Sequence, residues 1–156
     1  MVQNNKFTYR RSANAVVVSP SGKLLVLVGS KWHDRPDRSL QPDLVGGNIE
    51  SDETIVQGLT REVSEETGLE LAVDSVSLVF QNTYLSLHES EYWQNYYFLA
   101  ESLSSDVTLS WEHSAFYWVD IAEFVTVNWR PSQRFVVDFM NANGTLKNFT
   151  EIHNNK

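Results

Sequence analysis

The chain has 156 residues, of which 42% are hydrophobic, and its 12 Lys and Arg against 20 Asp and Glu give a formal charge of −8. This length and composition predict one soluble, acidic domain over residues 1–156. The absence of cysteine excludes a disulfide framework, a thiolate metal site and a cysteine nucleophile. No apolar run approaches the ~20 residues that cross a bilayer, so we expect a cytoplasmic protein without a membrane partner.

The charged residues are distributed unevenly. Residues 1–40 contain seven Lys or Arg and two Asp or Glu, whereas residues 50–70 contain seven Asp or Glu and only one cation, Arg61. A groove that binds nucleic acid is lined by cations, so we expect no nucleic-acid partner. An acidic cluster beside a basic segment suits a metal ion next to an anionic substrate, because the cation needs carboxylates and phosphates need positive charge.

The first elements of the chain read as an antiparallel hairpin followed by a loop. Residues 13–19 and 23–29 are rich in Val and Leu and flank a turn with Pro and Gly at residues 19–22. Residues 30–43 are polar and contain two prolines, which predicts a surface loop.

The strongest helix signal lies in residues 54–67. This segment has no proline and carries Val56, Leu59 and Val63 at helical spacing. Gly68 follows, and glycine suits the left-handed conformation that ends a helix.

The second half predicts several short strands and then helices. The strand candidates are residues 75–80, 83–87, 92–100, 107–110 and 116–119. Asp120 is placed to cap a short helix through Phe124, and Pro131 to begin a longer helix that ends at Gly144. Residues 1–11 and 145–156 are expected to be flexible or peripheral. One α+β sandwich accounts for this order of elements.

Three carboxylates share one face of the predicted helix 54–67. Glu62, Glu65 and Glu66 fall within about one turn, and such like charges weaken an isolated helix by a few tenths of a kcal/mol per pair. A hard divalent cation would turn this repulsion into shared coordination. The alternative is an ordinary solvated acidic face, which is the commoner meaning of such a pattern taken alone.

The surrounding residues decide between these alternatives. Fixed spacing relates seven residues, with Val63 and Leu69 at two apolar positions: Gly47, Glu53, Arg61, Glu62, Glu65, Glu66 and Gly68. A complete match of this kind arises by chance roughly once in a million chains or less. This segment, Gly47 to Leu69, resembles the Nudix box. By this segment the chain resembles the Nudix hydrolase family.

The resemblance implies an α/β/α sandwich with a mixed β-sheet. It also implies Mg²⁺ or Mn²⁺ bound by Glu62, Glu65 and Glu66 and by the backbone carbonyl of Gly46. In the alternative assignment, one of these glutamates is the general base instead of a metal ligand. Arg61 and Glu53 are then expected to pair and to hold the loop against the helix, so their part in catalysis is mainly structural.

A further acidic ligand is implied by a pattern in which a glutamate precedes a tryptophan at the start of a late strand. Glu112 and Trp118 fit this pattern. Glu89 and Glu91 are weaker candidates for this ligand. The alternative interpretation of Glu112 is an exposed residue in a turn.

Three positions depart from the common form of the box. Val45 stands where a proline commonly precedes the two glycines, and Asp52 where a glycine commonly precedes the first glutamate. Gly58 replaces a frequent alanine, which costs a helix up to ~1 kcal/mol unless the glycine permits close packing.

Substrate choice is less clearly encoded. Lys31, Arg35 and Arg38 precede the box and are candidates for binding phosphates, although surface cations are more often only solvated. Tyr84 is a candidate for stacking on a base, although a tyrosine in the core of a strand is the commoner meaning. Further stacking candidates are Trp32, Trp93, Trp111 and Trp129, although packing is their commoner role. The four histidines show no zinc-binding spacing.

We expect a Mg²⁺- or Mn²⁺-dependent pyrophosphohydrolase that cleaves a nucleoside diphosphate linked to another moiety. A (deoxy)nucleoside triphosphate is the first expected substrate, and a nucleotide sugar or ADP-ribose the second. The alternatives are a non-catalytic, nucleotide-sensing Nudix domain and a binding module without metal. An isoprenoid diphosphate isomerase is disfavoured because it characteristically uses cysteine. Homodimerisation is frequent in the family and is a weak expectation.

Overall fold

A computed structural model describes residues 6–154 of the chain. Its elements, in order, are β1 (Thr8–Val18), β2 (Leu24–Gly29), β3 (Pro42–Asp43), β4 (Val45–Asn48), α1 (Ile55–Thr67), the 3₁₀ turn η1 (Val73–Ser75), β5 (Ser77–Ser86), β6 (Glu91–Glu101), β7 (His113–Val119), α2 (Ile121–Phe124), α3 (Pro131–Ala142) and α4 (Thr145–Asn154). None of the helices in this described part is long and apolar enough to cross a membrane.

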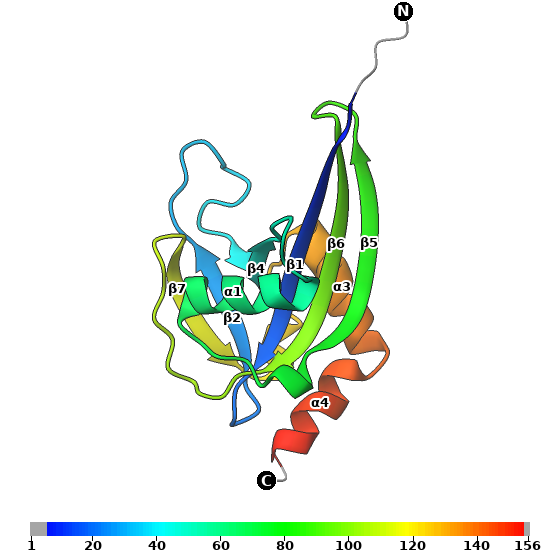
Figure 1. Cartoon of the computed structure of the whole chain (residues 1–156). Coiled ribbons are helices and arrows are strands. Elements are labelled where there is room, and N and C mark those ends of the chain that lie inside the picture. The colour runs from blue at the N-terminus through cyan, green and yellow to red at the C-terminus, as the bar shows by residue number, and fades with distance from the viewer. Residues whose placement is uncertain (1–5, 155–156) are drawn as a thin grey trace, which may run out of the picture.

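The strands form one mixed sheet (Figure 1). Its order is β3-β2-β1-β6-β5, with β4 paired to β1 and β7 paired to β2. β1 runs parallel to β6 along its whole length, whereas it meets β2 only at the pair of Val18 and Leu24. The predicted hairpin is therefore present, but its two strands diverge beyond the turn. This divergence leaves room for β4 beside β1, and β4 carries Gly46 and the first box residue, Gly47.

Helices cover both faces of the sheet. Along β1, Ala13, Ala15 and Val17 face the cluster that contains Leu59 and Val63 of α1. Val16 and Val18 alternate with them and belong to the opposite cluster, which also contains residues of α2, α3 and α4. Side chains of a strand alternate between its faces, so a strand with helices on both sides is apolar throughout. The predicted α/β/α sandwich with a mixed sheet is confirmed.

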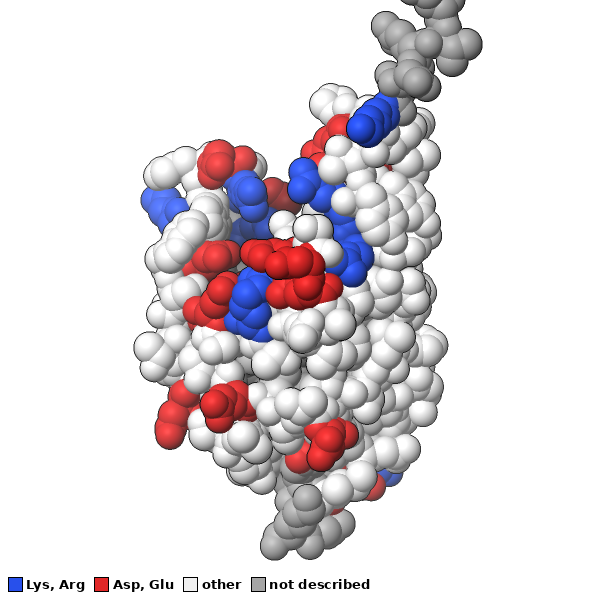
Figure 2. All heavy atoms as spheres, in the orientation of Figure 1, with Lys and Arg blue, Asp and Glu red and all other residues white. Residues whose placement is uncertain are grey.

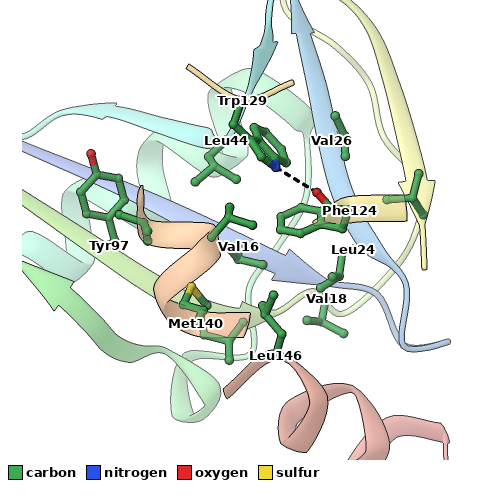
Figure 3. Packing of buried hydrophobic residues seen from close by; sticks show 14 residues of the cluster. Val16, Val18, Leu24, Val26, Leu44, Tyr97, Phe124, Trp129, Met140 and Leu146 are labelled. Atoms are coloured by element: carbon green, nitrogen blue, oxygen red, sulfur yellow. Dashed lines mark hydrogen bonds between the residues drawn. The ribbon is translucent and has the colours of Figure 1, made fainter. Parts of the chain in front are cut away.

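The second cluster fixes the start of α3. Figure 3 shows Phe124 and Trp129 packed against Val26, Leu24 and Leu44, with the Trp129 indole donating a hydrogen bond to the carbonyl of Phe124 over 2.9 Å. Trp129 is 4% exposed, so its role is packing, and it is no stacking surface for a base. The residue that follows it, Arg130, is thereby held at the N-terminus of α3.

Helix α1 has the ends that the sequence predicts. Thr54 accepts a hydrogen bond from the backbone N–H of Gln57, and the Gln57 side chain accepts one from Thr54 in return. Gly68 adopts the left-handed conformation with φ of 68°. Gly58 faces Ile49 and Glu53, and a Cβ atom there would lie 2.5 Å from Ile49 Cδ1. This glycine therefore permits close packing between the helix and the box loop.

Several local predictions were wrong. Residues 75–80 and 83–87 do not form two strands, because residues 77–86 pair continuously with β6 across one irregularity near Leu78. Residues 107–110 form no strand: the N–H groups of Thr108 and Ser110 donate to the carbonyls of Thr67 and Glu66, so this segment is tied to the end of α1. Within the predicted loop 30–43, Pro42 and Asp43 form β3 against β2.

Parts of the two chain ends, which the sequence predicts to be flexible or peripheral, form regular elements, and residues 155–156 lie outside the described residues. Residues 8–11 belong to β1, while residues 1–5 lie outside the described residues. Residues 145–154 form α4, whose Leu146 is 1% exposed and packs in the core cluster. Asp120 precedes α2 as predicted, but its side chain caps no amide there and binds Lys23 Nζ over 2.6 Å.

Candidate active site

A cavity of about 480 Å³ lies between the carboxylates of α1 and the sheet. It is lined by Ser12, Asn14, Arg35, Arg38, Gly46, Gly47, Asn48, Glu62, Glu66, Asn82, Tyr84, Trp93, Asn95, Tyr97, Glu112, Arg130, Ser132 and Gln133. Figure 2 shows acidic and basic side chains gathered over α1 and around the hollow between the 30–41 loop and β1. The cavity lies within the size range of small-molecule sites and carries both signs of charge.

Arg61 joins the helix to the box loop. Its guanidinium makes a two-point contact with Glu53, at 2.6 Å and 3.1 Å, and donates to the carbonyl of Asn48 over 2.9 Å. The same side chain donates to Glu62 and Glu65 over 2.9 Å and 3.1 Å. The Arg61–Glu53 pair that the resemblance implies is thus present in the structure. The hydrogen bonds that Glu53 accepts, first from Arg61 and then from the backbone of Glu50, hold the pKa of Glu53 at about 2, well below the ordinary value.

Two glycines of β4 allow the carboxylates of α1 to approach the sheet. The N–H of Gly46 donates to Glu66 Oε2 over 3.0 Å. A Cβ atom on Gly47 would lie 2.6 Å from Glu62 Oε2, so no other residue leaves this carboxylate in place. The Gly-Gly pair therefore orients both glutamates toward the cavity.

Burial and mutual repulsion raise the proton affinity of these two carboxylates. Glu66 is 5% exposed, and its burial, opposed by the Gly46 hydrogen bond and reinforced by Asp43, Glu112 and Glu62, raises its pKa to about 8. Burial also raises the pKa of Glu62, against the lowering effect of Arg61 and with Glu65 and Glu112 adding to the rise. A cation placed here would relieve both desolvation and repulsion.

The structure separates the other predicted residues into two groups. Glu112, Arg35, Arg38 and Tyr84 line the cavity, whereas Lys31 is not part of its lining. The Glu65 side chain is 61% exposed and bound to Arg61, so it stands outside the cavity lining.

The rivals proposed for Glu112 have other partners. Glu91 accepts hydrogen bonds from Arg10 and Trp93, and Glu89 accepts one from Ser86. Neither lines the cavity. Among the predicted stacking residues, Trp111 lies 5.1 Å from Trp32 in an edge-to-face pair, and both are absent from its lining.

The sequence indicated the two aromatic residues of one cavity wall, Tyr84 and Trp93, but not the polar side chains beside them. The rings of Tyr84 and Trp93 are stacked in parallel, with centroids 6.2 Å apart and an interplanar angle of 2°. Beside them Asn95 donates to Asn82, and Ser12 donates to Asn95. The two amides and the Ser12 hydroxyl come from β5, β6 and β1, which are adjacent only in the folded sheet, so no local pattern in the chain marks them.

The residues present fit a hard divalent cation. Glu62, Glu66 and Glu112 offer carboxylate oxygens within one cavity, and the backbone of Gly46 lies beside Glu66. One oxygen of Glu62 accepts a hydrogen bond from Arg61, and one oxygen of Glu66 accepts one from the N–H of Gly46. Each carboxylate therefore has a second oxygen to offer to a cation. Within residues 6–154, no three His, Asp or Glu side chains already surround a common point. Oxygen-only donors of this kind suit Mg²⁺ or Mn²⁺ better than zinc.

Comparison with known proteins identifies the fold and the family. The family model described as "NUDIX domain" matches residues 8–139. A MutT-like protein of Streptomyces ambofaciens is 40% identical over 72 residues, which are 46% of this chain and 42% of that protein. The chain therefore matches less than half the length of this curated relative.

Solved structures agree over most of the chain. The MutT protein from Methanosarcina mazei Go1 superimposes with a TM-score of 0.69 at 25% identity, covering 89% of this chain and 97% of that one. A C. elegans Ap4A hydrolase has a TM-score of 0.61 at 20% identity, with 85% and 96% covered. These structures share the α+β sandwich described above. The chain belongs to the NUDIX domain family.

Proposed function

We propose that this protein is a Mg²⁺- or Mn²⁺-dependent hydrolase that cleaves a phosphoanhydride bond of a nucleotide. A (deoxy)nucleoside triphosphate is the first candidate substrate, and a nucleotide sugar or ADP-ribose the second. One observation carries the proposal: Glu62, Glu66 and Glu112 line the same cavity as Arg35 and Arg38. The names of the similar proteins, MutT-like protein and Ap4A hydrolase, support the same class.

The carboxylates would hold the metal, and the arginines would bind phosphate oxygens. When bound, a divalent cation would neutralise charge on the phosphates and would make a water easier to deprotonate. A water oxygen then attacks one phosphorus, the bridging P–O bond breaks, and one of the site glutamates accepts the proton of the water. The departing group keeps the bridging oxygen: it is pyrophosphate from a triphosphate, or a sugar phosphate from a nucleotide sugar or ADP-ribose. No covalent bond to the protein is needed.

Arg61 and Glu53 serve this chemistry from outside the cavity. Their two-point contact and the bond from Arg61 to the Asn48 carbonyl keep the end of β4 against α1. A charge-assisted, bidentate pair gives geometric precision as well as energy. We assign both residues to positioning of the glutamates.

The wall of aromatic and amide side chains would receive the nucleoside. Tyr84 and Trp93 present apolar ring surface beside Asn82 and Asn95, and all four line the cavity. Aromatic faces bind bases with little selectivity, whereas amides supply directional hydrogen bonds. This arrangement favours a nucleotide over inorganic pyrophosphate alone.

The test is hydrolysis of a substrate panel at millimolar Mg²⁺. The panel contains nucleoside triphosphates, nucleotide sugars, ADP-ribose and dinucleotides, and released phosphate is measured with a coupled phosphatase or pyrophosphatase. We expect turnover of one class, abolished by chelation and lowered at least ~10²-fold by Glu66→Gln. The matched control is Glu70→Gln, an exposed glutamate that is not part of the lining of this cavity.

Glu65→Gln belongs in the same series, because the family resemblance makes Glu65 a metal ligand while the structure pairs it with Arg61. Loss of activity equal to that of Glu66→Gln would assign it to the metal site. If no compound turns over although Mg²⁺ or Mn²⁺ binds, the protein is instead a nucleotide-sensing domain and the enzyme proposal fails.

A further inference from the structure

Arg11 of β1 ties the sheet to the segment that leads into α1. Its Nη2 donates to the carbonyl of Glu50 over 2.6 Å and to the carbonyl of Glu53 over 3.4 Å. Its own carbonyl accepts the N–H of Ile49 over 2.9 Å. One residue of the sheet therefore contacts the backbone at three positions of this segment.

The turn that Arg11 contacts is closed by its own hydrogen bonds. The N–H of Glu50 donates to Glu53 Oε1 over 2.8 Å, and the N–H of Glu53 donates to the Glu50 carbonyl over 3.4 Å. Residues 50–53 therefore form one compact unit. Because a hydrogen bond from a charged donor is about twice as strong as a neutral one, the guanidinium of Arg11 fixes where this unit lies on the sheet.

From this turn, contacts lead to the cavity. Glu53 makes the two-point contact with Arg61, and Arg61 Nη1 donates to Glu62 Oε1 over 2.9 Å. Glu62 lines the cavity. A Cβ atom on Gly58 would lie 2.8 Å from Glu53 Oε1, so this carboxylate lies close against α1. A shift of the turn would therefore move the anchor of Arg61 and, with it, the Glu62 carboxylate.

Arg11 itself lies apart from the reacting groups. Side chains alternate along a strand, and Ala13 and Ala15 face the cluster beneath α1, whereas Ser12 lines the cavity. The half-buried Arg11 side chain shares the α1 side of the sheet and is not part of the cavity lining. Its effect on the chemistry must therefore pass through the turn.

We propose that Arg11 is a positioning residue, which fixes the turn of residues 50–53 and thereby the Glu62 carboxylate. It acts through the pair of Glu53 and Arg61. The inference rests on the proposed function, since it assigns a positioning role at the same site. Misplaced catalytic groups slow the reaction of bound substrate, so loss of Arg11 lowers kcat and kcat/KM together and leaves KM nearly unchanged.

The first test is kinetic and uses the panel nucleotide that the wild type hydrolyses fastest. Arg11→Met removes the guanidinium, and kcat should fall at least five-fold with KM within two-fold of wild type. Arg11→Lys keeps one cationic donor without the planar fork, so it should recover part of the loss and stay at least two-fold below wild type. A melting curve establishes that each variant is folded at the assay temperature.

The matched control is the preceding residue of the same strand. Arg10 is exposed and forms an ion pair with Glu91 over 3.0 Å. Arg10→Met should leave kcat unchanged. A loss in Arg10→Met equal to that in Arg11→Met, or wild-type kcat in the folded Arg11 variants, would overturn the proposal.

A double-mutant cycle tests the route through Arg61. Independent sites have effects that multiply in kcat, whereas residues that act through a shared contact do not. Arg11→Met should therefore lower kcat less in the Arg61→Lys background than in wild type. If the two losses multiply, Arg11 does not act through the pair of Glu53 and Arg61, and the proposal fails.

Calorimetric titration with Mn²⁺ requires no turnover. Since Glu62 is proposed to hold the metal, Arg11→Met should weaken Mn²⁺ binding at least three-fold, and Arg10→Met should leave it unchanged. This result would support the inference even if no compound in the panel is hydrolysed and the enzyme proposal fails. Wild-type Mn²⁺ affinity in Arg11→Met would overturn the inference while leaving the proposed function intact, and absence of Mn²⁺ binding by the wild type would overturn both.

Discussion

The buried Glu66 carboxyl predicts that the metal-free protein loses stability as the pH rises, and that Glu66→Gln removes this loss. Glu66 is 5% exposed, and its pKa is raised to about 8, chiefly by burial. In the unfolded chain the same group titrates near 4.5. Between these two values the folded protein retains a proton that the unfolded chain has released.

The sign of the effect follows from this difference. A raised pKa in the folded state contributes stability that is fully present below pH 4.5 and is lost as the pH rises through about 8. At about 1.36 kcal/mol per pKa unit, the complete loss has an upper limit of roughly 4 to 5 kcal/mol. Glutamine does not ionise and still offers an oxygen to the N–H of Gly46. The variant should therefore be more stable than wild type at high pH, although we expect it to be much less active.

The assay is urea unfolding of chelator-treated protein at pH 5 and pH 9. Wild type and the Glu70→Gln control should lose free energy of unfolding between these pH values, and Glu66→Gln should lose about 2 to 4 kcal/mol less. Saturating Mg²⁺ at pH 9 should restore much of the wild-type loss, because a ligand of the folded state stabilises it by mass action. Equal pH dependence in wild type and Glu66→Gln would refute the reasoning.

Three further substitutions test the frame of the site and the fold. Arg61→Lys keeps the charge but not the two-point contact with Glu53, so kcat/KM should fall at least ~10-fold and the melting temperature should also fall; unchanged kinetics would contradict a positioning role. Gly47→Ala should displace the Glu62 carboxylate, giving a similar loss of activity with less than ~1 kcal/mol lost in urea unfolding, whereas intact activity would show that the close approach is unimportant. Leu146→Ala should cost about 2 to 4 kcal/mol in the same unfolding assay with kcat unchanged, and a cost near zero would mean that α4 does not pack on the core.

Local sequence determined α1 and its chemistry because the relevant interactions are local. The Thr54 cap, the apolar stripe through Leu59 and Val63, and the left-handed Gly68 all act within a few residues. The box residues share one helix and the loop before it, so their spacing in the chain nearly equals their arrangement in space. The contact between Arg61 and Glu53 is of this kind, and it was expected before the structure.

Other features required the tertiary structure. The segment 107–110 has the composition of a strand, yet its N–H groups bind the end of α1 and place Glu112 at the cavity. The tail has a polar composition, yet Leu146 packs it onto the core as a helix. In both cases contacts with distant elements outweigh local preference, which is worth only fractions of a kcal/mol per residue.

The sequence by itself determined the family, the acidic helix and the loop that precedes it. Only the tertiary structure decided which side chains share the cavity with them. Asn82 and Asn95 meet because β5 pairs with β6, and Gln133 meets Asp43 because α3 packs against the sheet. Such pairs join residues that are 13 and 90 positions apart, and no periodicity or local spacing encodes them. The lining of the cavity is therefore a property of packing, whereas most of the carboxylates proposed to hold the metal lie in one continuous segment.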